Sequence, residues 1–407
     1  MNTDVVRQTV DLGFGRAELE NYLVACGFWA DARRRTRHQY VLSPSAYALS
    51  AAQVAQMERL ARSTHAAVVA LNQHLCECAA ASHPSREQAR MLRLASGASR
   101  GLLRPQDTLG IPPVFKVDLV QDGLGHFHIV EVDVYNPRGY GYAVLLEKSI
   151  ANVPGVRRLP GVQLLAKIVK QHTRSDPFWV LVPQYERYYE VHFEILCSAL
   201  RDFGIDARVV REQELSGISP GLVGTLLSIP DSLTSAQLRD TLLAQYRSGE
   251  LTALYPPVAY LGSKAYLPFL RAQEGMDECI PETELVGRKH HEWRRMLEDG
   301  SPCVLKAAVS SGMKGVFFSD TDQAFAQNIN EVGAFNHAAW ILQQQVPQQP
   351  TQVVVFNEAG ERHVGDYYLR LVAYVTQEGV LDVEVTGRPD RKVHGAPDCI
   401  QLPVILS

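Results

Sequence analysis

Three side chains that bind metal ions well, Glu131, Asp133 and Asn136, lie within six positions of the stretch FHIVEVDVYNPRGYG. Residues 131 and 133 are two apart, so on a β-strand both side chains point to one face. An Asp-Gly pair at 122–123 predicts a hairpin, which brings Asp118 of the preceding strand close to them. Three carboxylates on one face suit Mg²⁺, which takes a few carboxylates together with phosphate oxygens and water. The open alternative is a solvated acidic strand face.

The segment PCVLKAAVSSGMKGVFFS predicts a strand that ends at Lys306, a loop of small residues and a second apolar strand. The loop spans 309–315 and contains Ser310, Ser311 and Gly312. Small residues let backbone N–H groups approach a phosphate, and a lysine on a strand supplies a fixed positive charge. The pattern is not a Walker loop. An ordinary hairpin with a glycine turn is the alternative.

Three further segments carry candidate ligand contacts. Lys264 lies in the apolar stretch YLGSKAYLPFL, where a lysine either extends to solvent or meets an anion. The stretch HAAWILQQQVP runs into Gln344 and Gln345 before a proline, and can offer backbone groups to an adenine, although it also fits a plain strand end. Arg388, followed by Arg391, carries a guanidinium fork that suits phosphate or carboxylate, unless this is a solvated loop.

These residues need elements to position them, and the chain divides into four parts by pattern. The expected parts are a helical N-terminal region at 1–105, a metal-binding part at 106–175, a β-α-β substrate subdomain at 176–260 and a nucleotide-binding part with a lid at 261–407. The strand, helix and strand expected within 178–210 predict a parallel sheet. Because ligands collect at the carboxyl ends of parallel strands, substrate contacts are expected at Tyr185, Glu186 and Arg187.

Composition excludes some classes of partner. The 407 residues carry a formal net charge of −4, which gives no electrostatic footprint for nucleic acid or a membrane surface. Seven scattered cysteines indicate reduced thiols rather than a disulfide framework. The N-terminus lacks the pattern of a signal peptide, and no apolar run is long enough to cross a bilayer. We therefore expect a cytoplasmic protein.

The order of these motifs resembles that of the circularly permuted ATP-grasp ligases. The acid hairpin comes first, followed by Lys264, Lys306 with its loop, the strand before Gln344, and Arg388. The pattern is similar to the synthetase domain of bacterial glutathionylspermidine synthase and, more distantly, to eukaryotic glutathione synthetase. The resemblance implies a mixed α+β / α/β fold of the ATP-grasp type, circularly permuted, with a helical N-terminal region and a small parallel β-α-β subdomain.

Individual positions match the family's motifs. KVD, with Lys116 and Asp118, corresponds to an Arg-x-Asp motif, and EVD, with Glu131 and Asp133, to Glu-x-Asn. GSKAYLP corresponds to Ser-Asn-Lys-Ala-x-Leu-Pro and selects Lys264. The replacement of the family's arginine by Lys116 removes a guanidinium fork, which a lysine does not reproduce.

The function implied by the resemblance is an ADP-forming, ATP-dependent carboxylate–amine ligase that works through an acyl phosphate. The implied cofactors are ATP and Mg²⁺, and the implied partners are small-molecule carboxylate and amine substrates such as an amino acid, a small peptide or a polyamine. The roles implied are metal binding by Asp118, Glu131 and Asp133, nucleotide binding by Lys264, Lys306, Ser310, Ser311, Gly312, Gln344 and Gln345, and catalysis by Arg388 and Lys116. The alternatives are a small-molecule phosphotransferase and a non-catalytic nucleotide- or partner-binding protein.

Overall fold

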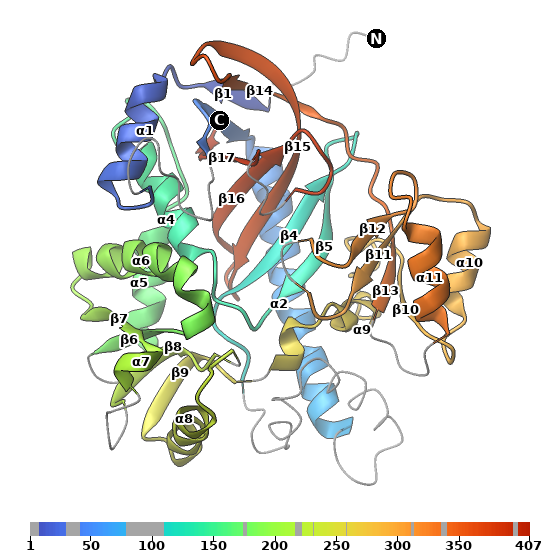
Figure 1. Ribbon diagram of the computed structural model, residues 1–407, viewed down its shortest axis with the longest axis horizontal. Helices are drawn as coiled ribbons and strands as arrows, with labels where there is room; N and C mark the ends of the chain where they lie inside the picture. Colours follow the sequence, from blue (N-terminus) through green and yellow to red (C-terminus); the bar gives the residue numbers. More distant parts are fainter. Residues whose placement is uncertain are drawn as a thin grey trace.

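The computed structural model describes residues 8–29, 41–78, 110–173, 177–215, 222–230, 232–257, 259–310, 313–334, 340–393 and 398–407. In these ranges the chain forms helices and four β-sheets, one large and three small (Figure 1). The mixed α and β class predicted from the sequence is confirmed. No helix in these ranges is both long and apolar enough to span a membrane.

The central sheet has seven strands and joins segments from the beginning, middle and end of the chain. In sheet order these are β2 (Val41–Leu42), β17 (Ile400–Leu402), β16 (Val380–Arg388), β15 (Arg362–Val375), β4 (Phe115–Gln121) and β5 (Phe127–Asp133), with β14 (Thr351–Phe356) paired to β15. The long helix α2 (Ala51–Cys78) packs on one face. Part of the opposite face is covered by α4 (Tyr140–Ser149) and α5 (Gly161–His172).

A second body is a four-stranded parallel sheet with helices around it. Its strands run in the order β7 (Ala207–Arg211), β6 (Phe178–Val182), β8 (Gly224–Ser228) and β9 (Leu251–Tyr255). Its helices are α6 (Glu190–Asp202), α7 (Glu212–Leu215) and α8 (Ala236–Ser248), and the 3₁₀ helix η3 (Gln184–Tyr189) follows β6. The segment expected to form strand, helix and parallel strand over 178–210 contains β6, α6 and β7 in that arrangement.

A third body is an antiparallel sheet with helices on one side. Its strands run in the order β10 (Thr283–Val286), β13 (Trp340–Gln344), β11 (Cys303–Ala307) and β12 (Val316–Phe318), and its helices are α10 (Glu292–Glu298) and α11 (Phe325–Gly333). Cys303 and Leu305 of β11 pack with these helices, so Val304 and Lys306 face the other way. The short elements η4 (Ala259–Gly262), η5 (Lys264–Tyr266) and α9 (Leu267–Arg271) precede β10 along the chain.

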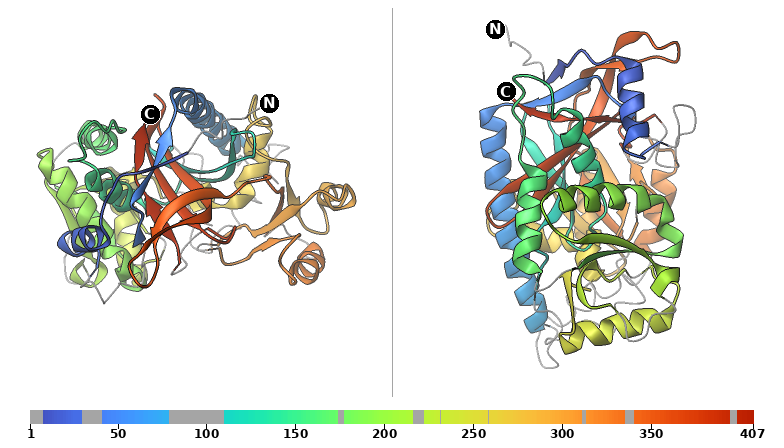
Figure 2. Two further views of the ribbon diagram at one scale, coloured as in Figure 1. Left: turned by 90° about the horizontal axis from the view of Figure 1, so that it is seen from above. Right: turned by 90° about the vertical axis from the view of Figure 1, so that its left-hand side faces the viewer.

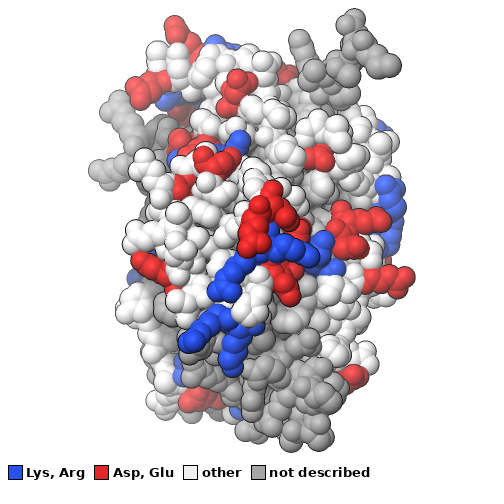
Figure 3. All heavy atoms as spheres, turned by 90° about the vertical axis from the view of Figure 1, so that its right-hand side faces the viewer, with Lys and Arg blue, Asp and Glu red and all other residues white. Residues whose placement is uncertain are grey.

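The central sheet lies between the two smaller bodies (Figure 2). On the side of the molecule that carries α10 and α11, acidic and basic side chains are intermingled rather than separated into one-sign patches (Figure 3). Arg295 and Glu282, for example, form an ion pair of 3.0 Å. The described residues of this face form no continuous basic surface for a polyanion.

The N-terminal region departs from the helical expectation for 1–105. Besides α1 (Arg16–Ala25) and α2, its described residues form β2 of the central sheet and two strands of a small sheet. That sheet has the order β1 (Thr9–Asp11), β3 (Ser45–Leu49) and β18 (Val404–Leu406). β2 and β3 form because β17 and β18, near the end of the chain, pair with them, which no local pattern reveals, and β1 pairs with β3. The stretch SHPSREQARMLRLAS at 82–96, which also has a helical pattern within the helical region expected at 1–105, lies outside the described residues.

Candidate functional site

A cavity of about 590 Å³ lies between the three bodies. That volume is within the range of small-molecule sites, roughly 300–1,000 Å³. Its charged lining residues are Lys116, Asp118, Glu131, Asp133, Arg138, Glu186, Lys264, Lys306, Arg370, Glu384 and Arg391. Six of these are bases and five are acids, although the whole chain carries a net charge of −4. The balance favours an anionic ligand.

Strand alternation directs the central sheet's polar residues into this cavity. Phe115, Val117 and Leu119 of β4 belong to the core that contains α2, so Lys116 and Asp118 point to the opposite face. Their cross-strand partners on β5, Asp133 and Glu131, share that face. Arg370 of β15 also points to this face. It lies two residues from Val372, which pairs directly with Asp118, and side chains two apart on a strand share a face.

A β-bulge at Val130 gives the two acids of β5 their direction. Asp118 pairs with Glu131, but the next residue, Leu119, pairs with Ile129, so Val130 is the extra residue of β5. The bulge lets Ile129 and Val132 both join the core while Glu131 faces the cavity. It also frees the carbonyl of Val130, which accepts a hydrogen bond of 2.9 Å from Nζ of Lys306.

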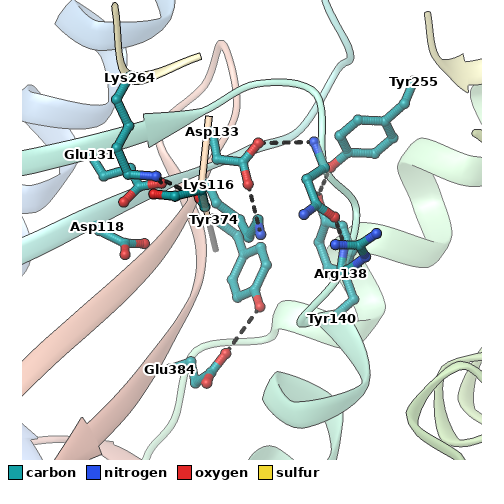
Figure 4. A network of polar contacts seen from close by, with 12 residues as sticks. Lys116, Asp118, Glu131, Asp133, Arg138, Tyr140, Tyr255, Lys264, Tyr374 and Glu384 are labelled. Atoms are coloured by element: carbon teal, nitrogen blue, oxygen red, sulfur yellow. Dashed lines mark hydrogen bonds and ion pairs between the residues drawn. The ribbon is translucent and has the colours of Figure 1, made fainter. Parts of the chain in front are cut away.

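Each of the three predicted metal-binding acids lies against a base. Asp118 contacts Arg370 at 3.1 Å, Glu131 contacts Lys264 at 3.0 Å, and Asp133 contacts Lys116 at 3.3 Å. Figure 4 shows the Lys264–Glu131 and Lys116–Asp133 pairs beside Asp118. Asp133 also accepts the backbone N–H of Asn136 at 3.0 Å, which fixes the turn after β5.

The pKa values of these groups reflect burial opposed by charge. Burial raises the pKa of Asp118, and Arg370 only partly offsets this. Burial also raises the pKa of Glu131, but the fields of Lys264 and Lys306 outweigh it and leave that pKa below its usual value. Burial lowers the pKa of Lys306 to about 8, against the opposing field of Glu131.

The two predicted lysines come from separate segments and meet at the bulged strand. Lys264, on η5, donates to the backbone carbonyl of Ser310 at 2.8 Å as well as pairing with Glu131. Lys306, on β11, donates to the side chain of Gln343 at 2.7 Å. Both lysines are almost fully buried and both line the cavity.

The predicted loop and the predicted adenine-binding segment are placed only in part. Ser310 lines the cavity, whereas Ser311 and Gly312 lie outside the described residues. Gln344 and Gln345 line the cavity, but their backbone N–H groups already donate to the carbonyls of Glu282 and Pro302. Within the described ranges, the buried Oε1 of Gln345 accepts no hydrogen bond.

The predicted catalytic residue Arg388 does not line the cavity. It lies at the end of β16, opposite Tyr368, four residues beyond Glu384, which pairs with Val372. There it contacts Asp398 at 2.8 Å and donates to the carbonyl of Lys392 at 3.0 Å. Arg370, which the motif comparison missed, occupies the cavity face instead. Its signal in the sequence is a lone arginine in the apolar run YYLRLVAYV.

Another part of the cavity carries a fourth ion pair, between Arg138 and Glu186. Arg138 contacts Glu186 through both Nε and Nη2, and its guanidinium lies 5.1 Å from the ring centre of Tyr189. Of the three residues expected to contact substrate, Glu186 lines the cavity, and Tyr185 and Arg187 do not. Tyr185 is 76 % exposed.

The donor set suits a magnesium ion shared with phosphates better than a metal held by protein alone. In the part of the chain that the structure describes, no group of three or more His, Cys, Asp or Glu side chains is placed to hold a metal. Asp118 and Glu131 face one another across paired strands. One or two carboxylates plus substrate phosphates is the usual way in which Mg²⁺ is bound.

Comparisons with known proteins leave the family open. No protein-family model matches the chain, and no curated protein matches it. Among solved structures, it is similar to a RimK domain protein ATP-grasp from Sphaerobacter thermophilus, with 18 % sequence identity and a TM-score of 0.27. The match covers 56 % of this chain and 89 % of that one. A TM-score this low assigns neither a fold nor an activity to this chain.

Proposed function

We propose that this protein is an ATP-dependent carboxylate–amine ligase of the ATP-grasp type, which forms an amide through an acyl phosphate and releases ADP and phosphate. The observation that carries the proposal is the convergence of four bases on the paired acids of one hairpin, inside one cavity. The bases are Lys116, Lys264, Lys306 and Arg370. Such a cavity suits a triphosphate bound together with a divalent cation.

The lysines would hold the nucleotide. Lys264 and Lys306 would bind the α- and β-phosphates, exchanging their present contacts with Glu131 and Val130 for phosphate oxygens. The apolar side chains of Val304, Val316 and Phe318 line the same part of the cavity and would cover the base. The 309–315 loop would lie over the γ-phosphate.

Asp118 and Glu131 would hold Mg²⁺, which on binding would neutralise charge on the transferring phosphoryl group. Arg370 and Lys116 would steady that group as it moves to the substrate carboxylate, and then the oxyanion formed when an amine attacks. The body formed by β10–β13 would keep water from the acyl phosphate. No enzyme nucleophile is needed for this sequence of steps.

The test is ADP release from Mg²⁺-ATP with pooled amino acids, small peptides and polyamines. We expect turnover that needs two co-substrates and yields an amide identifiable by mass spectrometry. Glu131→Gln should lower turnover at least ~100-fold because one of the two carboxylates proposed to hold Mg²⁺ is lost. Glu298→Gln, on the exposed end of α10, is the matched control.

Two other results would replace this proposal. Turnover with a single co-substrate, leaving a phosphorylated product, would make the protein a phosphotransferase. Nucleotide binding without turnover in the presence of any of the co-substrate pools would favour a non-catalytic nucleotide-binding protein. Absence of nucleotide binding would refute the proposal outright.

A further inference from the structure

One end of the cavity is built from the parallel sheet. Leu181 and Pro183 at the end of β6, and Ser228 and Pro230 at the end of β8, line it. The carboxyl ends of parallel strands are where such sheets bind ligands. In Figure 4 Arg138 lies on the other side of Asp133 from Glu131 and Lys264.

Arg138 is held in place from its own backbone and from its side chain. Its backbone N–H donates to Oδ1 of Asn136 at 3.0 Å, and Asn136 is in turn anchored on Asp133. Its Nε donates to Glu186 at 2.9 Å, and Nη2 contacts the other carboxylate oxygen. The third nitrogen, Nη1, donates no hydrogen bond within the described residues. The guanidinium therefore retains donors for a ligand.

Glu186 is placed to act together with Arg138. Its side chain is 11 % exposed and that of Arg138 is 25 % exposed, so the pair is shielded but reachable from the cavity. Each member of the pair neutralises the charge of the other. A ligand that brings one negative and one positive group can contact both members without leaving a charge buried alone.

The walls around this pair are aromatic and apolar. Tyr142, Tyr189 and Phe193 line the cavity here, together with the two prolines that end β6 and β8. Aromatic and proline walls of this kind bury an apolar side chain. They would exclude a long polar chain by leaving its polar groups without partners.

We infer that the Arg138–Glu186 pair binds the zwitterionic head of a free amino acid with an apolar or aromatic side chain, with the carboxylate on Arg138 and the ammonium group on Glu186. This inference rests on the proposed ligase function, in which the amino acid is one of the two co-substrates. It names a substrate class that the lysine-rich part of the cavity does not define.

The experiment is calorimetric titration of the full chain with each of the twenty standard amino acids, with and without Mg²⁺ and a non-hydrolysable ATP analogue. We expect binding of leucine, phenylalanine or a similar residue. The amide of that amino acid lacks the carboxylate and its N-acetyl derivative lacks the ammonium group, so both should bind at least ~10-fold more weakly. Titration with spermidine tests whether the site binds a polycation instead, and we expect it to bind more weakly than the preferred amino acid.

Substitutions of Arg138 and Glu186 test whether the amino acid binds to this ion pair. Arg138→Lys and Glu186→Gln should each weaken amino acid binding at least ~10-fold, because a fork or a charge is lost. Arg187→Lys is the matched control, since Arg187 lies on the same 3₁₀ helix outside the cavity. Circular dichroism and thermal melting confirm that each variant is folded.

Three results would overturn the inference: no amino acid binds under either condition, spermidine binds more tightly than every amino acid, or folded Arg138→Lys and Glu186→Gln bind the amino acid like wild type. Titration with the ATP analogue alone keeps this separate from the proposed function. Analogue binding without amino acid binding refutes only the inference, whereas amino acid binding without analogue binding refutes only the ligase.

Discussion

Arg370 and Arg388 differ by their position along paired strands. Both point to the same face of the central sheet, because Arg370 pairs with Thr386, two residues before Arg388. Only Arg370 reaches the cavity, where it contacts Asp118, whereas Arg388 is held by Asp398 at the strand end. A motif comparison cannot distinguish the two arginines, because the sequence does not show how strands β15 and β16 are aligned with each other.

Replacing each arginine by lysine separates them experimentally. We expect Arg370→Lys to lower ADP release at least ~10-fold, because lysine keeps the charge but cannot contact Asp118 and a phosphoryl group at once. Arg388→Lys, the matched control, should change it less than about twofold. The measurement is steady-state turnover with the co-substrates found above. The reverse order of effects would return the catalytic role to Arg388.

Among the other site residues, the sequence was informative where a side chain's direction follows from local pattern. Lys306 was identifiable because a strand ends at it before a small-residue loop. Glu131 was assigned to the hairpin, but simple alternation in FHIVEVD puts it on the same face as Phe127 and Ile129, which are core residues. The bulge at Val130 resolves this conflict, and bulges leave little trace in a single sequence.

At the scale of elements, strand β16 carries two buried acids, Asp382 and Glu384. Asp382 packs against a helix that covers the strand. Asp382 lies against the first residue of α5, so a Cβ at Gly161 would come within 2.3 Å of Oδ2 of Asp382. Only a glycine allows this approach. Burial, reinforced by the nearby charge of Glu147, raises the pKa of Asp382 well above its usual value.

This raised pKa predicts that stability falls as pH increases. Because the folded state holds its proton more tightly than the unfolded chain, the free energy of unfolding decreases from about pH 4, where unfolded Asp ionises, up to the folded pKa. Asp382→Asn should therefore melt at a higher temperature than wild type at pH 8, and the difference should vanish near pH 4. Thermal melts across that range measure it.

The exposed Asp390 supplies the control, since Asp390→Asn should shift melting little at any pH. The assignment of a protonated Asp382 would be wrong if the melting temperature of the wild type, measured relative to that of Asp382→Asn, rose steadily from pH 4 to pH 8.

Elements with strong local periodicity were predictable, and those that depend on distant partners were not. The hairpin of β4 and β5, the long helix α2 and the strand–loop–strand around Lys306 all follow from alternation, turn residues or helical spacing. The short strands β2 and β3 were missed because residues near the other end of the chain pair with them, and β1 was missed with them because it pairs with β3.

At the scale of the whole molecule, the pair of Lys264 and Glu131 connects separate parts of the cavity. Lys264 also binds the loop after β11, and Glu131 belongs to the central sheet. A nucleotide that draws Lys264 away leaves Glu131 partly buried without its base, which costs roughly 3–5 kcal/mol for a fully buried pair and less here. A cation supplied at the same time removes that cost.

We therefore expect ADP and Mg²⁺ to bind cooperatively. The affinity for ADP should rise at least ~10-fold when Mg²⁺ is present, as measured by calorimetry. In Glu131→Gln no carboxylate is left unpaired, so ADP alone should bind more tightly than to wild type, and the effect of Mg²⁺ should shrink. Equal coupling in wild type and Glu131→Gln would show that the ion pair does not link the two ligands.

The neighbouring positions of the first and last strands have a consequence for how the protein is made. β2 pairs with β17 and β3 pairs with β18, although most of the chain separates the members of each pair. A ribosome synthesises residues 41–49 long before residues 400–406, so β2 lacks β17 and β3, although it can already pair with β1, lacks β18 through nearly all of translation. The two sheets that these strands join can therefore be completed only when synthesis is almost finished.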